Sequence, residues 1–356
     1  MQDYEPLDLS TWCNTAPSDL VEDGDRAVGR QSFRGIPFLV GPESGSLSDK
    51  CYIGLGSPDS GLTIPVNSRA HGVLFAHRLL ETALPERGTV GVQVAEYLFH
   101  LSGGRTERAS VRERFEIAAI PTGDVRAGSS RPGPGVGRLT RQVLGQPYIA
   151  VTDGKPALLD RYQGRWDMLG RRQTEALPAE VKDYYLWAWK NPEPDRVIES
   201  VEIVPSGPKF IVAGITLGHV DEHPFNRQGR RPARIVLTDP ADAQKPFDLG
   251  VSVDRGDATF VHPLPDSSGG DSLGESIQGW GQEQNDRSSP AYVEVSAVPS
   301  ATVTVKHRGE ALGSLNWGEV ERRGSAETPA VRVELLEHGK NWVHVTVLDD
   351  ETGKPV

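Results

Sequence analysis

The sequence predicts an all-β protein made of two domains. Short stretches in which apolar and polar residues alternate recur along the chain, and turns rich in Gly and Pro separate them. No helical pattern continues for more than a turn or two, the best short candidate being 178–184. The chain has 356 residues, which is too long for one ordinary β-sandwich and suits two domains.

The stretch 184–217 contains the clearest strands and two proline-containing breaks. Tyr185, Trp187 and Trp189 alternate with other residues, so we expect one strongly aromatic sheet face. The Asn-Pro-Glu-Pro run at 191–194 ends this strand, because proline has no backbone N–H and restricts the residue before it. The last strand of the stretch is apolar enough to be buried on both faces. We therefore expect the stretch to close the first domain, with Trp187 and Trp189 in its core.

A jelly-roll or sandwich domain is predicted over 1–222, with an insertion at about 121–180. Short strands separated by Gly- and Pro-rich turns are typical of that architecture. The insertion interrupts the pattern with a glycine- and proline-rich run at 128–137. The other main strands expected in this domain are 33–40 (one strand whose Gly-Ile-Pro break suits an edge or a bulge), 62–66, 71–79, 89–101 and 108–117.

A second series of strands predicts an immunoglobulin-like sandwich over 232–348. It follows a polar linker that ends in an arginine-rich run. Residues 254–257 read as a hairpin turn between two of its strands. Residues 349–356 read as a turn that enters a further segment, so we expect the polypeptide to continue. The strands expected here are 235–237, 247–253, 258–262, 291–298, 302–307, 313–317, 331–336 and 342–348.

Composition narrows the range of partners. The net charge of −11 disfavours nucleic acid and anionic membranes, because binding to phosphates requires clustered Lys and Arg. No run approaches the roughly 18 apolar residues of a membrane-spanning helix. The N-terminus is acidic and lacks the apolar core of a signal peptide. These features predict a cytoplasmic protein, or a secreted one from which a leader has been removed.

Cys13 and Cys51 are the only cysteines. Two cysteines in a chain of this length do not make a disulfide framework. Free buried thiols are the simpler interpretation. A single bond between Cys13 and Cys51 is the alternative, if the first domain brings the two segments together.

The familiar catalytic motifs do not occur in the sequence, which has no Gly-x-Ser-x-Gly, His-Glu-x-x-His, Cys-x-x-Cys or Walker A pattern. The best metal candidates are His219, Asp221, Glu222 and His223, which are competent ligand types close together in the linker. A complete site would need further ligands from elsewhere in the fold. The alternative is an ordinary polar linker between two domains.

Seven tryptophans raise the question of sugar binding. β-Sandwich modules bind sugars by stacking an exposed aromatic ring on the pyranose face, while neighbouring polar side chains fix the hydroxyl groups. Trp166 and Tyr162, together with Arg165, lie in the arginine-rich insertion and are the candidates for such a ligand site. Simple packing of these rings is the alternative, since large apolar groups are usually buried.

Several segments of the first half resemble the galactose-binding-like jelly-roll modules attached to many glycan-active bacterial enzymes. The residues that carry this resemblance are 7–10 (Leu-Asp-Leu-Ser), 35–38 (Gly-Ile-Pro-Phe), 189–194 (Trp-Lys-Asn-Pro-Glu-Pro), 198–201 (Ile-Glu-Ser-Val) and 213–216 (Ala-Gly-Ile-Thr). The resemblance covers residues 1 to about 220, apart from the insertion. It implies a structural role for the Trp-x-Asn-Pro-x-Pro element.

The segments 298–305 and 341–356, taken with the first half, resemble the N-terminal region of metallohydrolases of the CehA/McbA type. In that family a PHP-like metal-dependent hydrolase domain follows the sandwiches. The resemblance therefore implies a divalent metal in that further domain and no cofactor in this chain. None of the family's His and Asp metal motifs is matched here, so no catalytic residue is carried over.

These observations lead to one principal hypothesis. The chain would be the non-catalytic N-terminal region of a larger bacterial hydrolase, with a galactose-binding-like jelly roll followed by an immunoglobulin-like sandwich. Its role would be to recognise a glycan or another small-molecule ligand, or to pack against a C-terminal catalytic domain. One alternative is a metal-dependent hydrolase in its own right, which uses the linker cluster. Another is a structural subunit whose sheets mediate homo-oligomer formation.

Overall fold

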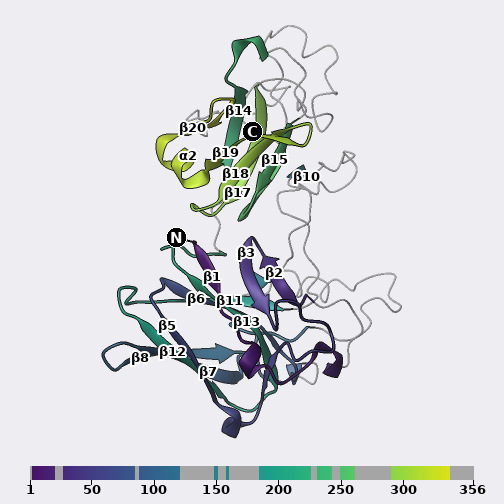
Figure 1. The fold of residues 1–356 in the computed structure, drawn as a ribbon, viewed down its shortest axis with the longest axis vertical. Helices are drawn as coiled ribbons and strands as arrows, with labels where there is room; N and C mark the ends of the chain where they lie inside the picture. Colours follow the sequence, from purple (N-terminus) through teal and green to yellow (C-terminus); the bar gives the residue numbers. More distant parts are fainter. Residues whose placement is uncertain are drawn as a thin grey trace, which may run out of the picture.

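The computed structural model describes residues 2–20, 27–84, 88–120, 148–150, 158–159, 184–225, 231–242, 249–260 and 290–336. Within these ranges the chain forms several sheets, almost all antiparallel, and one α-helix, which confirms the all-β fold class. The strands gather in two bodies, one built mainly from the N-terminal part and the other mainly from residues after 230 (Figure 1). The finer assignments to a galactose-binding-like jelly roll and an immunoglobulin-like sandwich remain predictions.

Two sheets of the first domain pack on one core. One sheet runs in the order β1 (Tyr4–Pro6), β13 (Phe210–Gly218), β6 (Gly72–Leu79), β11 (Tyr185–Lys190) and β9 (Tyr148–Ile149), and β4 (Ile53–Leu55) also pairs with β13. The other sheet runs in the order β5 (Leu62–Ser68), β12 (Ile198–Pro205), β7 (Gln93–Leu101) and β8 (Arg105–Arg112).

The core between these sheets confirms the aromatic face predicted for β11. Trp189 is buried, and its ring stacks on Phe99 with the centroids 3.7 Å apart. Trp187 is partly buried, packs against the same core and lies 5.6 Å from Phe75 between ring centroids. Residues two positions apart in a strand point to the same face, so both tryptophans reach one core.

The break after β11 is organised by Asn191, which is almost fully buried. Its side-chain amide donates to the Ala70 carbonyl at 2.9 Å, and its side-chain oxygen accepts from the Glu193 N–H at 2.9 Å. Its backbone N–H donates to the carbonyl of His71 at 2.8 Å. These bonds hold the chain where the following proline prevents the strand from continuing.

β13 is buried along its whole length, as its apolar sequence predicts. Phe210 faces the core between the two sheets, whereas Ile211 contributes to a second cluster on the opposite face. The hairpin of β2 (Gly29–Phe33) and β3 (Ile36–Val40) packs into that second cluster. Since the sheet is covered on both sides, each residue of β13 needs to be apolar or small.

Residues 29–40 form this hairpin, and the prediction of a single strand over 33–40 is wrong. The chain reverses at Arg34 and Gly35, which have positive φ angles of 54° and 77°. Two successive positive φ angles are what a type I′ hairpin turn requires, and glycine adopts this conformation at little cost. Arginine is not a usual signal for the first position of such a turn, so the sequence pattern concealed the reversal.

The second domain also contains two sheets. One runs in the order β10 (Leu158–Leu159), β16 (Gly256–Phe260), β17 (Ala291–Ala297), β14 (Arg231–Leu237), β21 (Val331–Leu335) and β20 (Ser325–Glu327). The other runs in the order β15 (Leu249–Val253), β18 (Thr302–His307) and β19 (Glu310–Asn316). Alternate residues of β17 and β18 are buried and fill a core shared by the two sheets.

The turn at 254–257 is not the hairpin turn that was predicted. The strands on either side of it, β15 and β16, belong to different sheets, so the chain crosses from one sheet to the other at Asp254 and Arg255. β14 also begins earlier than expected, at Arg231, inside the arginine-rich run that was read as linker. Arginine is compatible with a strand whose alternate residues face solvent.

A short helix, α2 (Trp317–Arg323), follows β19 where a strand was predicted to end. Asn316 caps it by accepting a hydrogen bond from the Glu319 N–H at 3.0 Å, and Gly324 ends it in the left-handed conformation. Two turns are too few for helical periodicity to be distinguished from a strand pattern. Among the described residues, no helix is long and apolar enough to cross a membrane.

Cys13 and Cys51 are free thiols, as the simpler interpretation predicted. Cys13 packs against the core between the sheets of the first domain, whereas Cys51 belongs to the cluster on the opposite face of one of those sheets. Their sulfurs bond to different carbonyl groups, those of Leu9 and Ser46. The structure therefore agrees with two free thiols, of which Cys51 is buried and Cys13 is partly buried.

The structure describes two short pieces of the segment predicted as an insertion. Residues 148–149 form β9, which pairs with β11 of the first domain. Residues 158–159 form β10, which runs parallel to β16 of the second domain. These two pieces of the segment therefore contact one domain each.

Candidate functional site

The ligand candidates Trp166, Tyr162 and Arg165 lie outside the residues that the structure describes. A sugar site in the predicted insertion therefore remains a prediction. Among the described residues, polar contacts are found in the linker after β13 and at the junction between the domains.

Two of the four metal candidates pair with residues of the first domain. His219 Nε2 lies 3.1 Å from Glu5 Oε2, which joins the linker to β1. Asp221 forms an exposed ion pair with Lys190, at 3.1 Å between Oδ1 and Nζ. Hydrogen bonding and attraction from the Lys190 ammonium lower the pKa of the Asp221 carboxyl.

The other two candidates point elsewhere. His223 lies against Tyr148 and Phe225, with ring centroids 6.0 Å and 6.1 Å away, and partial burial lowers the pKa of its imidazole. Glu222 turns toward the second domain. In the described ranges no three His, Cys, Asp or Glu side chains are grouped as a metal-ligand set would be. Each of the four linker residues therefore has different partners.

Glu222 connects the N-terminal strand of the first domain to a turn of the second. Its Oε1 accepts hydrogen bonds from the Tyr4 hydroxyl at 3.1 Å and from the Ser300 hydroxyl. Its Oε2 accepts from the backbone N–H of Ser300 at 3.0 Å. Ser300 lies between β17 and β18, so one carboxylate fixes that turn against β1.

Tyr4 is buried beneath this carboxylate, with 2% of its surface exposed. Burial raises the pKa of its phenol far above the usual value, and the charge of Glu222 and the hydrogen bond to it act in the same direction. The phenol therefore remains protonated and acts as a hydrogen-bond donor to Glu222.

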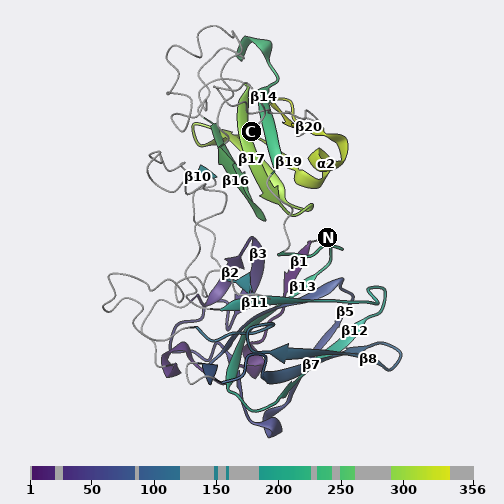
Figure 2. The ribbon, with the colours of Figure 1, turned by 180° about the vertical axis from the view of Figure 1, so that it is seen from behind.

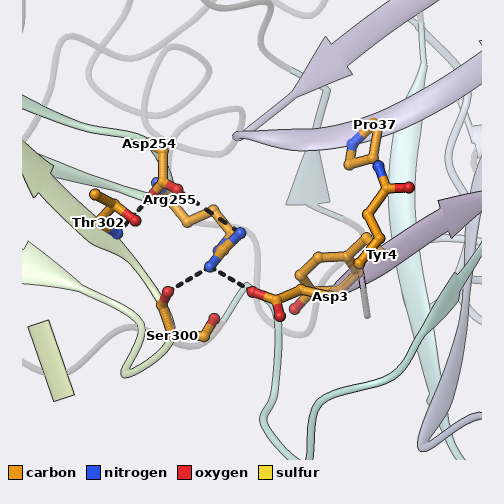
Figure 3. Close-up of a pocket in the computed structure, with 8 residues that line it drawn as sticks. Asp3, Tyr4, Pro37, Asp254, Arg255, Ser300 and Thr302 are labelled. Carbon is orange, nitrogen blue, oxygen red and sulfur yellow. Dashed lines mark hydrogen bonds and ion pairs between the residues drawn. The ribbon is translucent and has the colours of Figure 1, made fainter. Parts of the chain in front are cut away.

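Arg255 is the charged residue at the centre of the junction, and 9% of its surface is exposed. Its Nη2 donates to Asp3 Oδ2 at 3.0 Å and to the Ser300 carbonyl. Its Cζ lies 5.6 Å from the centre of the Tyr4 ring. Figure 3 shows the side chain extending from the second domain toward Asp3 and Tyr4. A guanidinium this far from water is tolerated because a carboxylate, a carbonyl and an aromatic face surround it.

Asp254 shapes the turn that presents Arg255. Its Oδ1 accepts from the backbone N–H groups of Arg255 and Thr302, each at 2.7 Å. Its Oδ2 lies 3.7 Å from Arg255 Nη1, which is longer than a direct hydrogen bond. One carboxylate oxygen of Asp254 therefore fixes the backbone of the turn, and the other lies beside the guanidinium of Arg255.

The tip of the β2–β3 hairpin reaches the same turn from the first domain. A Cβ on Gly35 would lie 1.9 Å from the carbonyl oxygen of Asp254 and 2.8 Å from Arg255 Cγ. A larger residue at this position would require the backbone of one domain to move. In both views of the molecule, β1 and this hairpin lie at the end of the first domain that faces the second (Figure 1 and Figure 2).

The junction leaves an open hollow of about 380 Å³ between the domains. Residues of both domains line it, among them Asp3, Tyr4, Pro37, Asp254, Arg255 and Thr302 (Figure 3). The lining combines carboxylate acceptors, guanidinium donors and hydroxyl groups. Chemically, the arrangement can hold two domains together and can bind a small polar group.

A second buried polar site lies inside the first domain. His77 is fully buried, and its Nε2 lies 2.8 Å from the carbonyl oxygen of Glu116. Because a carbonyl only accepts, Nε2 carries the hydrogen and Nδ1 accepts from the Tyr97 hydroxyl at 3.0 Å. Burial lowers the pKa of His77 to about 4. The neutral ring therefore links β6 to β7 and to the loop after β8, which is a structural role.

Sequence reasoning identified only Glu222 among the junction residues and assigned it to a metal. Asp3 and Arg255 were missed because 252 positions separate these two partners. The one available signal was an arginine beside Asp254 and Asp257, and arginine in a turn usually faces solvent.

Comparisons of this chain with protein-family models, with curated proteins and with solved structures found no match. The resemblance to CehA/McbA-type metallohydrolases therefore remains a prediction, and function is inferred from the described residues.

Proposed function

We propose that this chain is a non-catalytic accessory region of a larger metal-dependent hydrolase. Its two β-sandwich domains would keep one relative orientation, in order to pack against the catalytic part or to take part in recognising its substrate. The observation that carries the proposal is the junction, where buried polar groups of one domain are bonded to groups of the other.

Arg255 supports a fixed orientation because its charge is balanced by a residue of the other domain. Separation of the domains would remove Asp3 from the guanidinium and Glu222 from Ser300. Leaving a buried polar group without its partner costs about 1–3 kcal/mol. Since the Asp3 side chain is 41% exposed, the ion pair itself contributes toward the lower end of that range. Several such contacts together favour one relative orientation of the two domains over free movement of one domain against the other.

The alternative of a hydrolase that uses the linker cluster receives less support. A metal bound there would have to displace Lys190 from Asp221 and the Tyr4 and Ser300 groups from Glu222. Loss of the hydrogen bonds from Tyr4 and Ser300 to Glu222 would also weaken the domain junction.

Metal analysis and hydrolase assays of the purified chain separate these two functions. We expect less than stoichiometric divalent metal and no hydrolysis of ester or phosphodiester substrates. Stoichiometric metal together with an activity that the Asp221→Asn variant loses would overturn the accessory role.

Small-angle X-ray scattering tests the fixed orientation. The wild-type curve should fit a single arrangement of the domains, and Arg255→Met should broaden the distribution of distances between them. Arg322→Met is a suitable control because Arg322 is exposed on α2. A wild-type curve that already requires many arrangements would contradict the proposal.

Two further measurements address the recognition role and the assembly alternative. Glycan-array binding that Trp166→Ala abolishes would support recognition through the predicted insertion, and binding of no glycan would leave the packing role. A dimer or larger species in multi-angle light scattering would favour the structural-subunit alternative.

A further inference from the structure

The guanidinium of Arg255 is only partly used by the domain junction. Nη2 makes the hydrogen bonds of this side chain, to Asp3 and to the Ser300 carbonyl. Among the described residues Nη1 makes none, and Nε is a buried donor with no acceptor. An arginine that is nine-tenths buried therefore keeps donor capacity at the wall of the hollow.

Asp254 Oδ2 forms an ion pair with Arg255 Nη1 without a direct hydrogen bond. It lies 3.7 Å from Nη1, which is too long for a direct hydrogen bond and is a separation that one oxygen bonded to both groups would span. A hydroxyl group can accept from Nη1 and donate to Oδ2 at the same time, because it has both a hydrogen and lone pairs.

The charges around the hollow narrow the class of ligand. The carboxylates of Asp3 and Asp254 face it together with the single guanidinium of Arg255. The two carboxylates would repel an anionic ligand and only one guanidinium would attract it, so the hollow disfavours anions. A bound metal ion is disfavoured because no set of three ligand side chains is present among the described residues.

We infer that this hollow binds a neutral polyol, such as the end of a saccharide with adjacent hydroxyl groups. One hydroxyl bridges Arg255 Nη1 and Asp254 Oδ2, and a neighbouring hydroxyl donates to the carboxylate of Asp3. The ring of Pro37 provides an apolar contact for the carbon skeleton. Because the partners come from both domains, the bound polyol would also reinforce their orientation. The inference does not require a catalytic domain and so goes beyond the proposed function.

Titration of the full chain with galactose, glucose, mannose and glycerol tests this inference, with glucuronate as the anionic comparison. Isothermal calorimetry or ligand-observed NMR should detect binding of at least one neutral saccharide in the millimolar range, and weaker binding of glucuronate. Asp254→Asn keeps an acceptor oxygen for the backbone N–H groups but can replace the Oδ2 acceptor by a donor. We expect it to weaken binding about tenfold or more.

Asp195→Asn is the matched control, because Asp195 is exposed and outside the hollow, and it should bind as the wild type does. Unchanged melting temperature and scattering curve would show that Asp254→Asn leaves the junction intact. If that variant loosens the junction, Asp3→Asn serves as the second test, with the same expected loss. Failure of all the neutral probes to bind, equal binding by the folded variants, or preference for glucuronate would each overturn the inference.

Discussion

Gly35 of the first domain and Asp254 of the second lie in direct backbone contact. A Cβ on Gly35 would stand 1.9 Å from the carbonyl oxygen of Asp254, which is closer than any real Cβ contact. The φ angle of +77° at Gly35 also belongs to the tight turn of its hairpin. The close approach of the two domains therefore requires a glycine at position 35, in addition to the ionic contacts beside it.

Gly35→Ala is therefore expected to disturb the domain junction. The Cβ disfavours the positive φ angle by about 1–2 kcal/mol, and the clash with Asp254 adds to this. Gly104→Ala is the matched control, since Gly104 has a φ of +74° and no atom lies within 4 Å of the place that a Cβ would take there. Urea unfolding should show a loss for both variants, and scattering should show an altered domain arrangement only for Gly35→Ala. Identical scattering from the two variants would contradict the role given to Gly35.

Glu222→Ala should destabilise the protein by about 2–4 kcal/mol. The substitution removes the acceptor for the Tyr4 hydroxyl, the Ser300 hydroxyl and the Ser300 N–H, and it leaves these buried or half-buried donors unpaired. Glu199→Ala is the control because Glu199 is exposed on β12. Denaturant unfolding measures both, and an equal, small effect of the two substitutions would show that Glu222 contributes little to the junction.

The free energy of unfolding should fall as the pH drops from about 6.5 to 4, because His77 is protonated more easily in the unfolded chain. The pKa of this imidazole is about 4 in the folded chain and 6.5 in an ordinary environment. Between those values the unfolded chain binds a proton that the folded chain excludes, so acid favours unfolding. Below pH 4 the free energy of unfolding is lower by about 3 kcal/mol, whereas well above pH 6.5 it is not reduced.

His77→Leu isolates this contribution. The variant lacks the bonds to Tyr97 and Glu116 and should be less stable at pH 8, but its free energy of unfolding should change less between pH 6.5 and 4 than that of the wild type. Urea titrations across this range provide the comparison. Parallel pH profiles for the two proteins would exclude His77 as the titrating group.

Both thiols should react slowly with a thiol reagent at pH 8 in the native protein. Cys51 is fully buried, and burial raises the pKa of Cys13 to about 12, so little reactive thiolate is present. Unfolding in urea should release two fast-reacting thiols per chain. Recovery of no thiol without a reductant would instead indicate a disulfide between Cys13 and Cys51.

Much of the sheet structure could be predicted from local patterns. The alternation around Trp189 indicates which face of β11 carries the aromatic side chains of the core, and the unbroken apolar run of β13 indicates burial on both faces, because side chains alternate across a strand. The proline at position 192 marks the end of β11 for an equally local reason, the missing backbone donor. Features of this kind are properties of a few consecutive residues.

The hairpin turn at Arg34 and Gly35 marks the limit of such patterns. The sequence predicts one strand there, since the reversal has Arg-Gly in place of the usual Asn-Gly. Likewise, α2 is too short for its periodicity to appear, although Asn316 and Gly324 stand at its two ends.

The candidate site depends on the fold to a greater extent. The four polar residues of the linker suggest a metal cluster by their proximity in the sequence, but proximity along the chain does not show which way each side chain turns. Glu222 reaches Ser300 across 78 positions, and Arg255 reaches Asp3 across 252. Strand periodicity is local, whereas these contacts arise when two domains dock and buried charges must find partners. The residue types therefore predicted the sheets, and the docking of the domains gave Arg255 its role.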